Sequence, residues 1–250
     1  MKRFVAAIRF LTVLPVPGSW GAAEADLARS VPAFPVVGLL LGVAAAGGAY
    51  GLAALAAPPM VSAAALVLVL AAFSGGLHLD GLADTADGFL SSRPRERVLE
   101  IMRDSHTGAM GVIAITGVML LKFAALASIE PARLWPAALL APLAGRCAMV
   151  MHMAMLSYVR EKGLASVFCR RRPYASAVWA AAVLAAACWA VFGVPGLAVA
   201  GGCVAVAGGL AVWFYRKIGG ATGDTFGAAC ECVELVPAVV LAVWPMTAVR

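Results

Sequence analysis

Charged residues are scarce in this sequence. They make up 13% of the 250 residues, whereas 63% of the residues are hydrophobic and the mean hydropathy is +0.93. A water-soluble domain typically has about a quarter charged residues and less than half apolar ones. The chain has too few polar side chains to cover a soluble fold of this length. A lipid bilayer is therefore its expected environment, and an ordinary soluble domain is excluded.

Paired cysteines of the kind that bind metals are also missing. None of the six cysteines shows C-x-x-C spacing, and four of them fall inside apolar runs. Cysteine in such a run usually acts as a small hydrophobic residue. We therefore expect neither disulfide bonds nor a cysteine metal site.

The N-terminal segment lacks the cleavage site of a signal peptide. It begins with basic residues followed by apolar ones, but no small-x-small pattern follows, and Pro15 and Pro17 interrupt it. We expect the segment to be retained. Residues 1–31 are predicted to form an amphipathic or interfacial region of a single domain that spans residues 1–250.

Long apolar runs occupy most of the remaining sequence. A helix needs roughly 20 apolar residues to cross ~30 Å of hydrocarbon. Seven stretches qualify, at about residues 32–56, 60–79, 108–128, 134–157, 175–193, 196–215 and 229–248. Prolines punctuate the gaps between several of them, as expected at helix ends. The predicted fold is all-α, a polytopic integral membrane protein with about seven transmembrane helices.

The basic residues are distributed unevenly between the two sides of this predicted topology. Fifteen of the nineteen fall in segments on one side: Lys2, Arg3, Arg9, Arg29, Arg93, Arg95, Arg97, Arg103, Arg160, Lys162, Arg170, Arg171, Arg172, Arg216 and Lys217. The other side has Arg133 and Arg250. Such asymmetry predicts that the basic side, with the N-terminus, is cytoplasmic. Topology thus explains the net charge of +6, and we expect no nucleic-acid partner.

The acidic residues gather on the same side. Nine of the thirteen lie at or near its helix ends: Asp80, Asp84, Asp87, Glu96, Glu100, Asp104, Asp224, Glu231 and Glu234. Glu130 faces the other side. An ion-coupled transporter is expected to place its carboxylates near the bilayer midplane. The distribution therefore favours a site at one membrane surface.

Three of these residues form the sharpest pattern. Asp80, Asp84 and Asp87 are spaced i, i+4, i+7, which places them within about 60° of one another on a helix. Three anions on one face repel each other, and Mg²⁺, which prefers carboxylate oxygens and often bridges to phosphates, would relieve the repulsion. A solvated acidic face is the alternative. Leu, Ala and Gly surround the aspartates without a basic residue at helical spacing, so we favour metal binding.

Two further acidic groups are candidates for the same site. Glu100 and Asp104 are spaced i, i+4 before the third predicted span, and Asp224 and Glu231 are spaced i, i+7, with Glu234 one turn further on. Three helices would then converge on one or two Mg²⁺ ions, as in in-line phosphoryl displacement. Nearby basic residues would neutralise a diphosphate or serve only as topology signals; these are Arg93, Arg103 and Lys217.

Two cations lie inside predicted spans. A charge there costs about 2.5–3.5 kcal/mol on insertion scales, so it usually has a partner or a function. Lys122 either snorkels to the far interface or has a function, whereas Arg146 forms a buried ion pair or contacts substrate. Among the histidines, His78 points away from Asp80 on a regular helix, and His106 is either a base or a loop residue.

At these residues the sequence resembles a known family, the cobalamin (5′-phosphate) synthases, also called adenosylcobinamide-GDP ribazoletransferases. The resemblance covers essentially the full chain. The matching segments are FLTVLPVP (10–17), FPVVGLLLG (34–42), GGLHLDGLADTADGF (75–89), EIMRDSHTG (100–108) and GDTFGAACECVEL (223–235). Lys122 and Arg146 also fall where such proteins have a basic residue. His106 departs from the pattern, because some relatives have arginine there.

The resemblance implies a reaction. Adenosylcobinamide-GDP and α-ribazole, or its 5′-phosphate, would give adenosylcobalamin, or its 5′-phosphate, and GMP, with Mg²⁺ as cofactor. It implies a bacterial cytoplasmic (inner) membrane location, with the site facing the cytoplasm and lipid around the chain. A homo-oligomer is left open. The resulting assignments are metal ligands Asp80, Asp84, Asp87, Glu100 and Glu231; catalytic residues Asp104, Asp224 and Arg146; and substrate-binding residues Arg103, Lys122 and Lys217.

Other membrane proteins share part of this pattern. A CDP-alcohol phosphotransferase is expected to continue its first aspartates as DGxxAR, but Asp80-Gly81 is followed by Leu82-Ala83-Asp84. A prenyltransferase would need a cavity for a lipid tail, which sequence does not exclude. A transporter is less favoured because of the acidic distribution described above.

Overall fold

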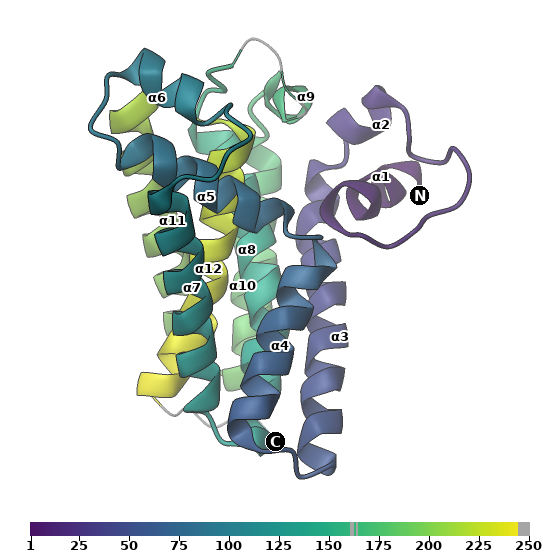
Figure 1. The fold of residues 1–250 in the computed structure, drawn as a ribbon. Coiled ribbons are helices and arrows are strands. Elements are labelled where there is room, and N and C mark those ends of the chain that lie inside the picture. Colours follow the sequence, from purple (N-terminus) through teal and green to yellow (C-terminus); the bar gives the residue numbers. More distant parts are fainter. Residues whose placement is uncertain (161–162, 164, 245–250) are drawn as a thin grey trace.

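The computed structural model describes residues 1–160, 163 and 165–244, and this part of the chain is helical (Figure 1). The longer helices are α3 (Phe34–Ala54), α4 (Pro59–Phe73), α5 (Leu77–Phe89), α7 (Ala109–Ala127), α8 (Trp135–Met155), α10 (Tyr174–Phe192), α11 (Gly196–Ile218) and α12 (Gly223–Val243). The shorter ones are α1 (Lys2–Leu11), α2 (Glu24–Ala28), α6 (Arg95–Ile101) and α9 (Ser166–Cys169), with 3₁₀ turns at Val31–Ala33 and Pro131–Arg133. Lys162 and Arg250 lie outside the described residues.

The helices confirm the predicted all-α membrane fold. Within the described residues, six helices are long and apolar enough to cross a membrane, and the count becomes seven if α4 and α5 form one broken span. That pair bends by 88° between Phe73 and Leu77. The orientation of the chain in the membrane stays a prediction.

The second predicted span is shorter than expected. It was predicted to run to about residue 79, but α4 ends at Phe73. Gly75 and Gly76 follow with φ angles of +60° and +79°, a left-handed conformation that glycine adopts without steric cost. These two glycines turn the chain, so that α5 runs across one end of the bundle instead of continuing through it (Figure 1).

The last predicted span begins earlier than expected, at Gly223 rather than near residue 229. Thr222 caps this helix: its hydroxyl oxygen accepts from the backbone N–H of Thr225, whose hydroxyl oxygen accepts from the N–H of Thr222. Hydropathy alone missed this first turn because it contains the polar Asp224. The predicted end near residue 248 lies outside the described residues.

Helix α8 lies at the centre of the bundle. Every residue from Leu140 to Ala154 is buried, and the helix packs against α3, α10, α11 and α12. Gly145 allows a close approach, because a β-carbon there would lie 2.7 Å from the Cys230 sulfur on α12. Proline inside α8 and α12 is tolerated, as is common in membrane helices.

The short helices gather at one end of the bundle, which we call the α5 end. Helices α1, α2, α6 and α9 lie there with α5, at the top of Figure 1. Helix α1 buries Ala6, Ala7 and Leu11 and exposes Lys2 and Arg3. Its amphipathic pattern suits an interfacial segment. The interfacial role of residues 1–31 and the single domain over residues 1–250 stay predictions.

Candidate functional site

Two glycines bring α5 against the first turns of α12. A β-carbon on Gly81 would lie 2.8 Å from the Asp224 carbonyl oxygen, and one on Gly227 would lie 3.1 Å from the His78 carbonyl oxygen. Only a residue without a side chain permits this backbone approach at Gly81. The glycines of the LDGLAD and GDTFGA segments thus join the two acidic motifs.

The approach groups carboxylates from both helices. The charges of Asp80, Asp87 and Asp224 all act on Asp84. Asp80 is exposed, whereas Asp84, Asp87 and Asp224 are partly buried. We call Asp80, Asp84 and Asp224 the open acidic group. Like charges that approach each other in a partly buried place destabilise one another, so this arrangement favours binding of a cation.

Arg160 neutralises part of the open acidic group. One of its Nη atoms lies 2.6 Å from Asp224 Oδ2, and it donates a 3.0 Å hydrogen bond to the Met102 carbonyl oxygen. Both side chains are largely buried, at 13% and 20% exposed. Arg160 also interacts with Asp84. One guanidinium does not neutralise three carboxylates, so the open acidic group keeps a surplus of negative charge.

Asp87 has a different set of partners. Its two carboxylate oxygens accept hydrogen bonds from the backbone N–H groups of Gly108, at 2.7 Å, and Gly111, at 2.8 Å. These are the N-cap and third residues of α7, so Asp87 satisfies the free amides at the start of that helix. Its predicted role as a metal ligand would have to compete with this capping role.

The open acidic group fits Mg²⁺ through its donor chemistry rather than through a completed set of ligands. Among the residues described, no three side chains of Asp, Glu, His or Cys lie close enough together to hold a metal ion. Mg²⁺ often takes only one or two protein carboxylates, with waters and substrate phosphates as its other ligands. Asp80 and Asp84, one helical turn apart on α5, meet that requirement.

A cavity of about 220 Å³ lies beside the open acidic group. Asp80, Arg160 and Asp224 line its polar part. Its apolar part is lined by Met149, Met153 and Phe226, among others. The α5 end of the bundle therefore combines surplus negative charge with a mostly apolar hollow.

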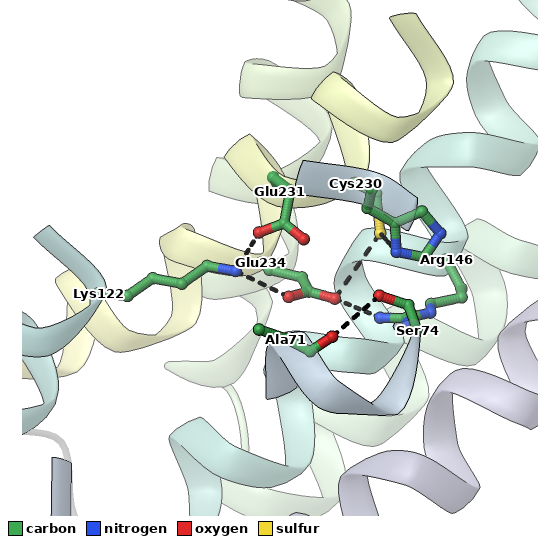
Figure 2. A network of polar contacts seen from close by, with 8 residues as sticks. Ala71, Ser74, Lys122, Arg146, Cys230, Glu231 and Glu234 are labelled. Carbon is green, nitrogen blue, oxygen red and sulfur yellow. Dashed lines mark hydrogen bonds and ion pairs between the residues drawn. The ribbon is translucent and has the colours of Figure 1, made fainter. Parts of the chain in front are cut away.

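Deeper in the bundle lies a closed ion-pair network, shown in Figure 2. Lys122 on α7 donates to Glu231 at 2.6 Å and to Glu234 at 2.9 Å, while Arg146 on α8 donates to Glu234. All four side chains are at most 5% exposed. We call Lys122, Arg146, Glu231 and Glu234 the buried network.

The buried network gives protein partners to three of the predicted site residues, Lys122, Arg146 and Glu231. Arg146 makes the buried ion pair that was one of its two predicted alternatives, and the snorkelling alternative for Lys122 is wrong. Glu231 faces Lys122 rather than the open acidic group. Lys122, Arg146 and Glu231 therefore lie in the buried network, and their predicted substrate-binding, catalytic and metal-binding roles stay predictions.

Glu100 and Asp104 pair within their own segment. Glu100 lies 2.7 Å from Arg97, and Asp104 Oδ1 lies 2.7 Å from His106 Nδ1 and also accepts from the His106 N–H. The hydrogen bonds from His106 lower the pKa of Asp104. Arg103 is exposed and Lys217 is partly exposed, both at the α5 end. Their predicted contacts with metal or substrate stay predictions.

The two remaining histidines are buried. The Nδ1 of His152 lies 2.8 Å from the Ala148 carbonyl oxygen, one turn earlier on α8. His78 is buried between α5 and α12, with its Nδ1 3.6 Å from Cys230 Sγ. The six cysteines are free.

The chain matches a known family over nearly its whole length. The family model described as cobalamin-5-phosphate synthase covers residues 3–242. The chain belongs to this family. The resemblance noted in the sequence is thus confirmed at the level of the family.

Several curated proteins similar to the chain carry the name adenosylcobinamide-GDP ribazoletransferase. The protein from Geotalea daltonii is 37% identical over 94% of this chain and 95% of its own length. That from Desulforamulus reducens is 40% identical over 91% of each chain, and that from Klebsiella pneumoniae is 40% identical over 94% of this chain and 97% of its own. No solved structure matches the chain.

In the sequence, Arg160 counted only as a topology signal. The positive-inside rule accounts for every arginine of the basic segments alike, so it does not single out one that contacts Asp224. One signal was present in the sequence. Arg160 follows shortly after the α8 span, so it is expected at the same membrane surface as the acidic motifs.

Proposed function

We propose that this protein joins adenosylcobinamide-GDP to α-ribazole, or to α-ribazole 5′-phosphate, and releases GMP. One observation carries the proposal: a cavity with Asp80 and Asp224 in its polar part, in a chain whose relatives are named for this transfer. We further propose that the site faces the cytoplasm of a bacterium, because basic residues are concentrated in the segments at the α5 end.

In the proposed reaction, a ribose hydroxyl oxygen of the ribazole forms a bond to the phosphorus nearest cobinamide. The bond from that phosphorus to the oxygen bridging to GMP breaks, and GMP leaves. The hydroxyl proton passes to a carboxylate. Of the two candidates for this base, Asp224 is supported by its place in the cavity, whereas Asp104 is exposed and paired with His106.

Each residue of the α5 end has a role in this proposal. Asp80 and Asp84 would hold Mg²⁺, which when bound would neutralise the diphosphate and the departing GMP. Arg160 orients the Asp224 carboxylate through their 2.6 Å ion pair. Arg103 and Lys217 are left as candidate contacts for the diphosphate.

The test is turnover by purified protein in liposomes, with both substrates and Mg²⁺, followed by mass spectrometry. We expect Mg²⁺-dependent formation of cobalamin, or its 5′-phosphate, together with GMP. Asp84→Asn is expected to lower turnover by at least about a hundredfold, a loss typical when charge stabilisation in a site is removed.

Glu130→Gln is the matched control, because Glu130 is an exposed carboxylate in the segment between α7 and α8, far along the chain from the acidic motifs. It should turn over like the wild type. Folded wild-type protein that makes no product would contradict the proposal. In that case other activated diphosphates, beginning with CDP-alcohol substrates, are the next to assay.

A further inference from the structure

The chain between α1 and α2 exposes large apolar side chains. We call residues 12–23 the connecting segment. Val13, Leu14 and Trp20 in it are 59%, 57% and 53% exposed. The proposed reaction uses none of them. Three large apolar side chains exposed so close together in an irregular segment indicate a surface that contacts another body.

The connecting segment is held in place by hydrogen bonds. The Arg9 guanidinium on α1 donates to the Val16 carbonyl oxygen at 2.8 Å and also to that of Gly18. The Thr12 hydroxyl oxygen accepts from the Leu14 N–H at 3.2 Å. These contacts fix the backbone that carries the exposed side chains, so their exposure is part of the fold.

Contacts with α3 and α4 fix the depth of the connecting segment. The apolar stretch Val31–Ala54 is long enough to cross a membrane, and α1 packs against it, with the rings of Phe10 and Phe34 6.0 Å apart. The Val13 N–H donates to the Phe73 carbonyl oxygen at 3.0 Å, at the end of α4.

Helix α4 places this contact near the edge of the hydrocarbon. It has 15 residues and so a length of about 22 Å, less than the ~30 Å of a bilayer core. In Figure 1 the connecting segment runs below α1, on the side nearer the middle of the bundle, before it rises to α2. Its apolar side chains therefore lie where the spans meet the membrane surface.

Basic side chains accompany the apolar ones. Lys2 and Arg3, in the first turn of α1, are exposed, as is Arg29 after α2. The region before α3 holds four basic residues and two acidic ones, and the acidic Glu24 is already paired with Arg170 at 2.5 Å. The region thus carries surplus positive charge, which complements a negatively charged surface.

We propose that α1 and the connecting segment dock on the surface of an anionic phospholipid bilayer. Val13, Leu14 and Trp20 enter the boundary between headgroups and acyl chains, a region where tryptophan is enriched. Lys2 and Arg3 contact lipid phosphates. Sequence alone predicted an interfacial segment, and the structure adds the side chains that dock and the charge of the lipid they meet.

The docked helix also forms part of the cavity at the α5 end. Phe10 of α1 lines that cavity, and its ring lies 4.9 Å from the ring of Phe168, next to α9 and the segment after α8. Apolar insertion and basic residues act together, because stable attachment to a membrane surface usually takes two signals. The membrane surface thereby holds one wall of the cavity in place.

The experiment measures amide hydrogen exchange of the full-length protein in two bilayers, phosphatidylcholine alone and an equal mixture with phosphatidylglycerol. Exchange of the α1 amides reports how often this helix opens. One double variant, Lys2→Gln with Arg3→Gln, removes charge, and another, Val13→Ser with Leu14→Ser, removes apolar contact. Arg216→Gln is the matched control, because Arg216 is an exposed arginine in the last turn of α11, outside the N-terminal region.

We expect phosphatidylglycerol to slow exchange in α1 of the wild type. The charge variant should lose this effect, by about fivefold for each basic residue removed. The apolar variant should exchange faster than the wild type in both bilayers, and Arg216→Gln should behave like the wild type. Equal exchange of the wild-type α1 in the two bilayers would overturn the proposal.

Fluorescence of Trp20 gives an independent measure of depth, which stays decisive if the double variants do not fold. The difference in signal between the wild type and Trp20→Phe isolates this residue from the other tryptophans. Lipid brominated on its acyl chains should quench the difference signal, and acrylamide in the water should not. Quenching by acrylamide alone would place the connecting segment in water and contradict docking on lipid.

Discussion

Helix α12 carries acidic residues in two regions that differ in how their charge is balanced. Asp224, in its first turn, belongs to the open acidic group, in which Arg160 interacts with Asp84 and Asp224. Glu231 and Glu234, two to three turns further along, belong to the buried network and face Lys122 and Arg146. Carboxylates of one helix thus serve two different purposes.

The difference follows from the cost of burying charge. Inside the bundle an unpaired ion is very unfavourable, so two carboxylates are matched by two cations and the buried network is neutral. At the α5 end water reaches the side chains, and surplus negative charge is tolerated. The open acidic group can therefore accept a cation or a substrate-bound ion, whereas the buried network connects α7, α8 and α12.

The largest expected effect comes from breaking the buried network. Glu234→Gln removes the carboxylate that Lys122 and Arg146 share and leaves buried positive charge uncompensated. Breaking a buried ion pair in this way typically costs about 3–5 kcal/mol. The free energy of unfolding of the purified protein in detergent, measured by denaturant titration, should fall by that amount.

The matched control for this prediction is on the same helix. Asp224→Asn removes a largely buried carboxylate that lies among like charges, and Arg160 keeps Asp84 as a partner, so the free energy of unfolding should fall by only about 1 kcal/mol. If both variants destabilise the protein equally, the distinction between the two regions is wrong.

A smaller effect is expected at Asp87, the α5 residue that accepts hydrogen bonds from the first turn of α7. It caps α7, and loss of a cap costs about 0.5–2 kcal/mol. Asp87→Ala should lower the free energy of unfolding by this amount, measured without Mg²⁺. Asp80→Ala, an exposed residue on the same helix, should leave it nearly unchanged.

The same pair of variants separates capping from metal binding. If Asp87 mainly caps α7, Mg²⁺ binding measured by calorimetry should weaken more in Asp80→Ala than in Asp87→Ala. The reverse order would make Asp87 the stronger ligand and restore its predicted role.

Much of this arrangement was predictable because it depends on local spacing. Apolar length identified the spans, and the i, i+4, i+7 spacing placed Asp80, Asp84 and Asp87 on one helix, α5. The glycine turn before α5 and the cap at Thr222 shifted helix boundaries that hydropathy alone does not define.

The partners of Glu231 and Arg160 were not predictable for physical reasons. Asp224 and Glu231 share a helix face at i, i+7, but seven residues span about 10 Å along the axis. A common face is therefore not a common site, and Glu231 lies at the depth of Lys122. Arg160 reaches Asp224 across 64 positions of sequence only after the helices have packed, and no local pattern encodes that contact.

The smallest expected effect is at Asp104, the exposed carboxylate that pairs with His106. Because hydrogen bonds from His106 lower its pKa below the ordinary value of 3.8, the pair stabilises the folded state above that value. The contribution is lost as the pH falls through the lower, folded-state pKa. Asp104→Asn should thus have a slightly lower unfolding midpoint than the wild type at pH 5–7, and the difference should vanish at lower pH.

Turnover by the same variant tests the choice between the two candidate bases. With Asp224 as the base, Asp104→Asn should retain most of the activity, because Asp104 is exposed and its partner is a neighbouring loop residue. A loss as large as that expected for Asp84→Asn would mean that the segment before α7 closes onto the substrate. Asp104 would then belong to the open acidic group, and the boundary between the exposed loop and the site would have to be redrawn.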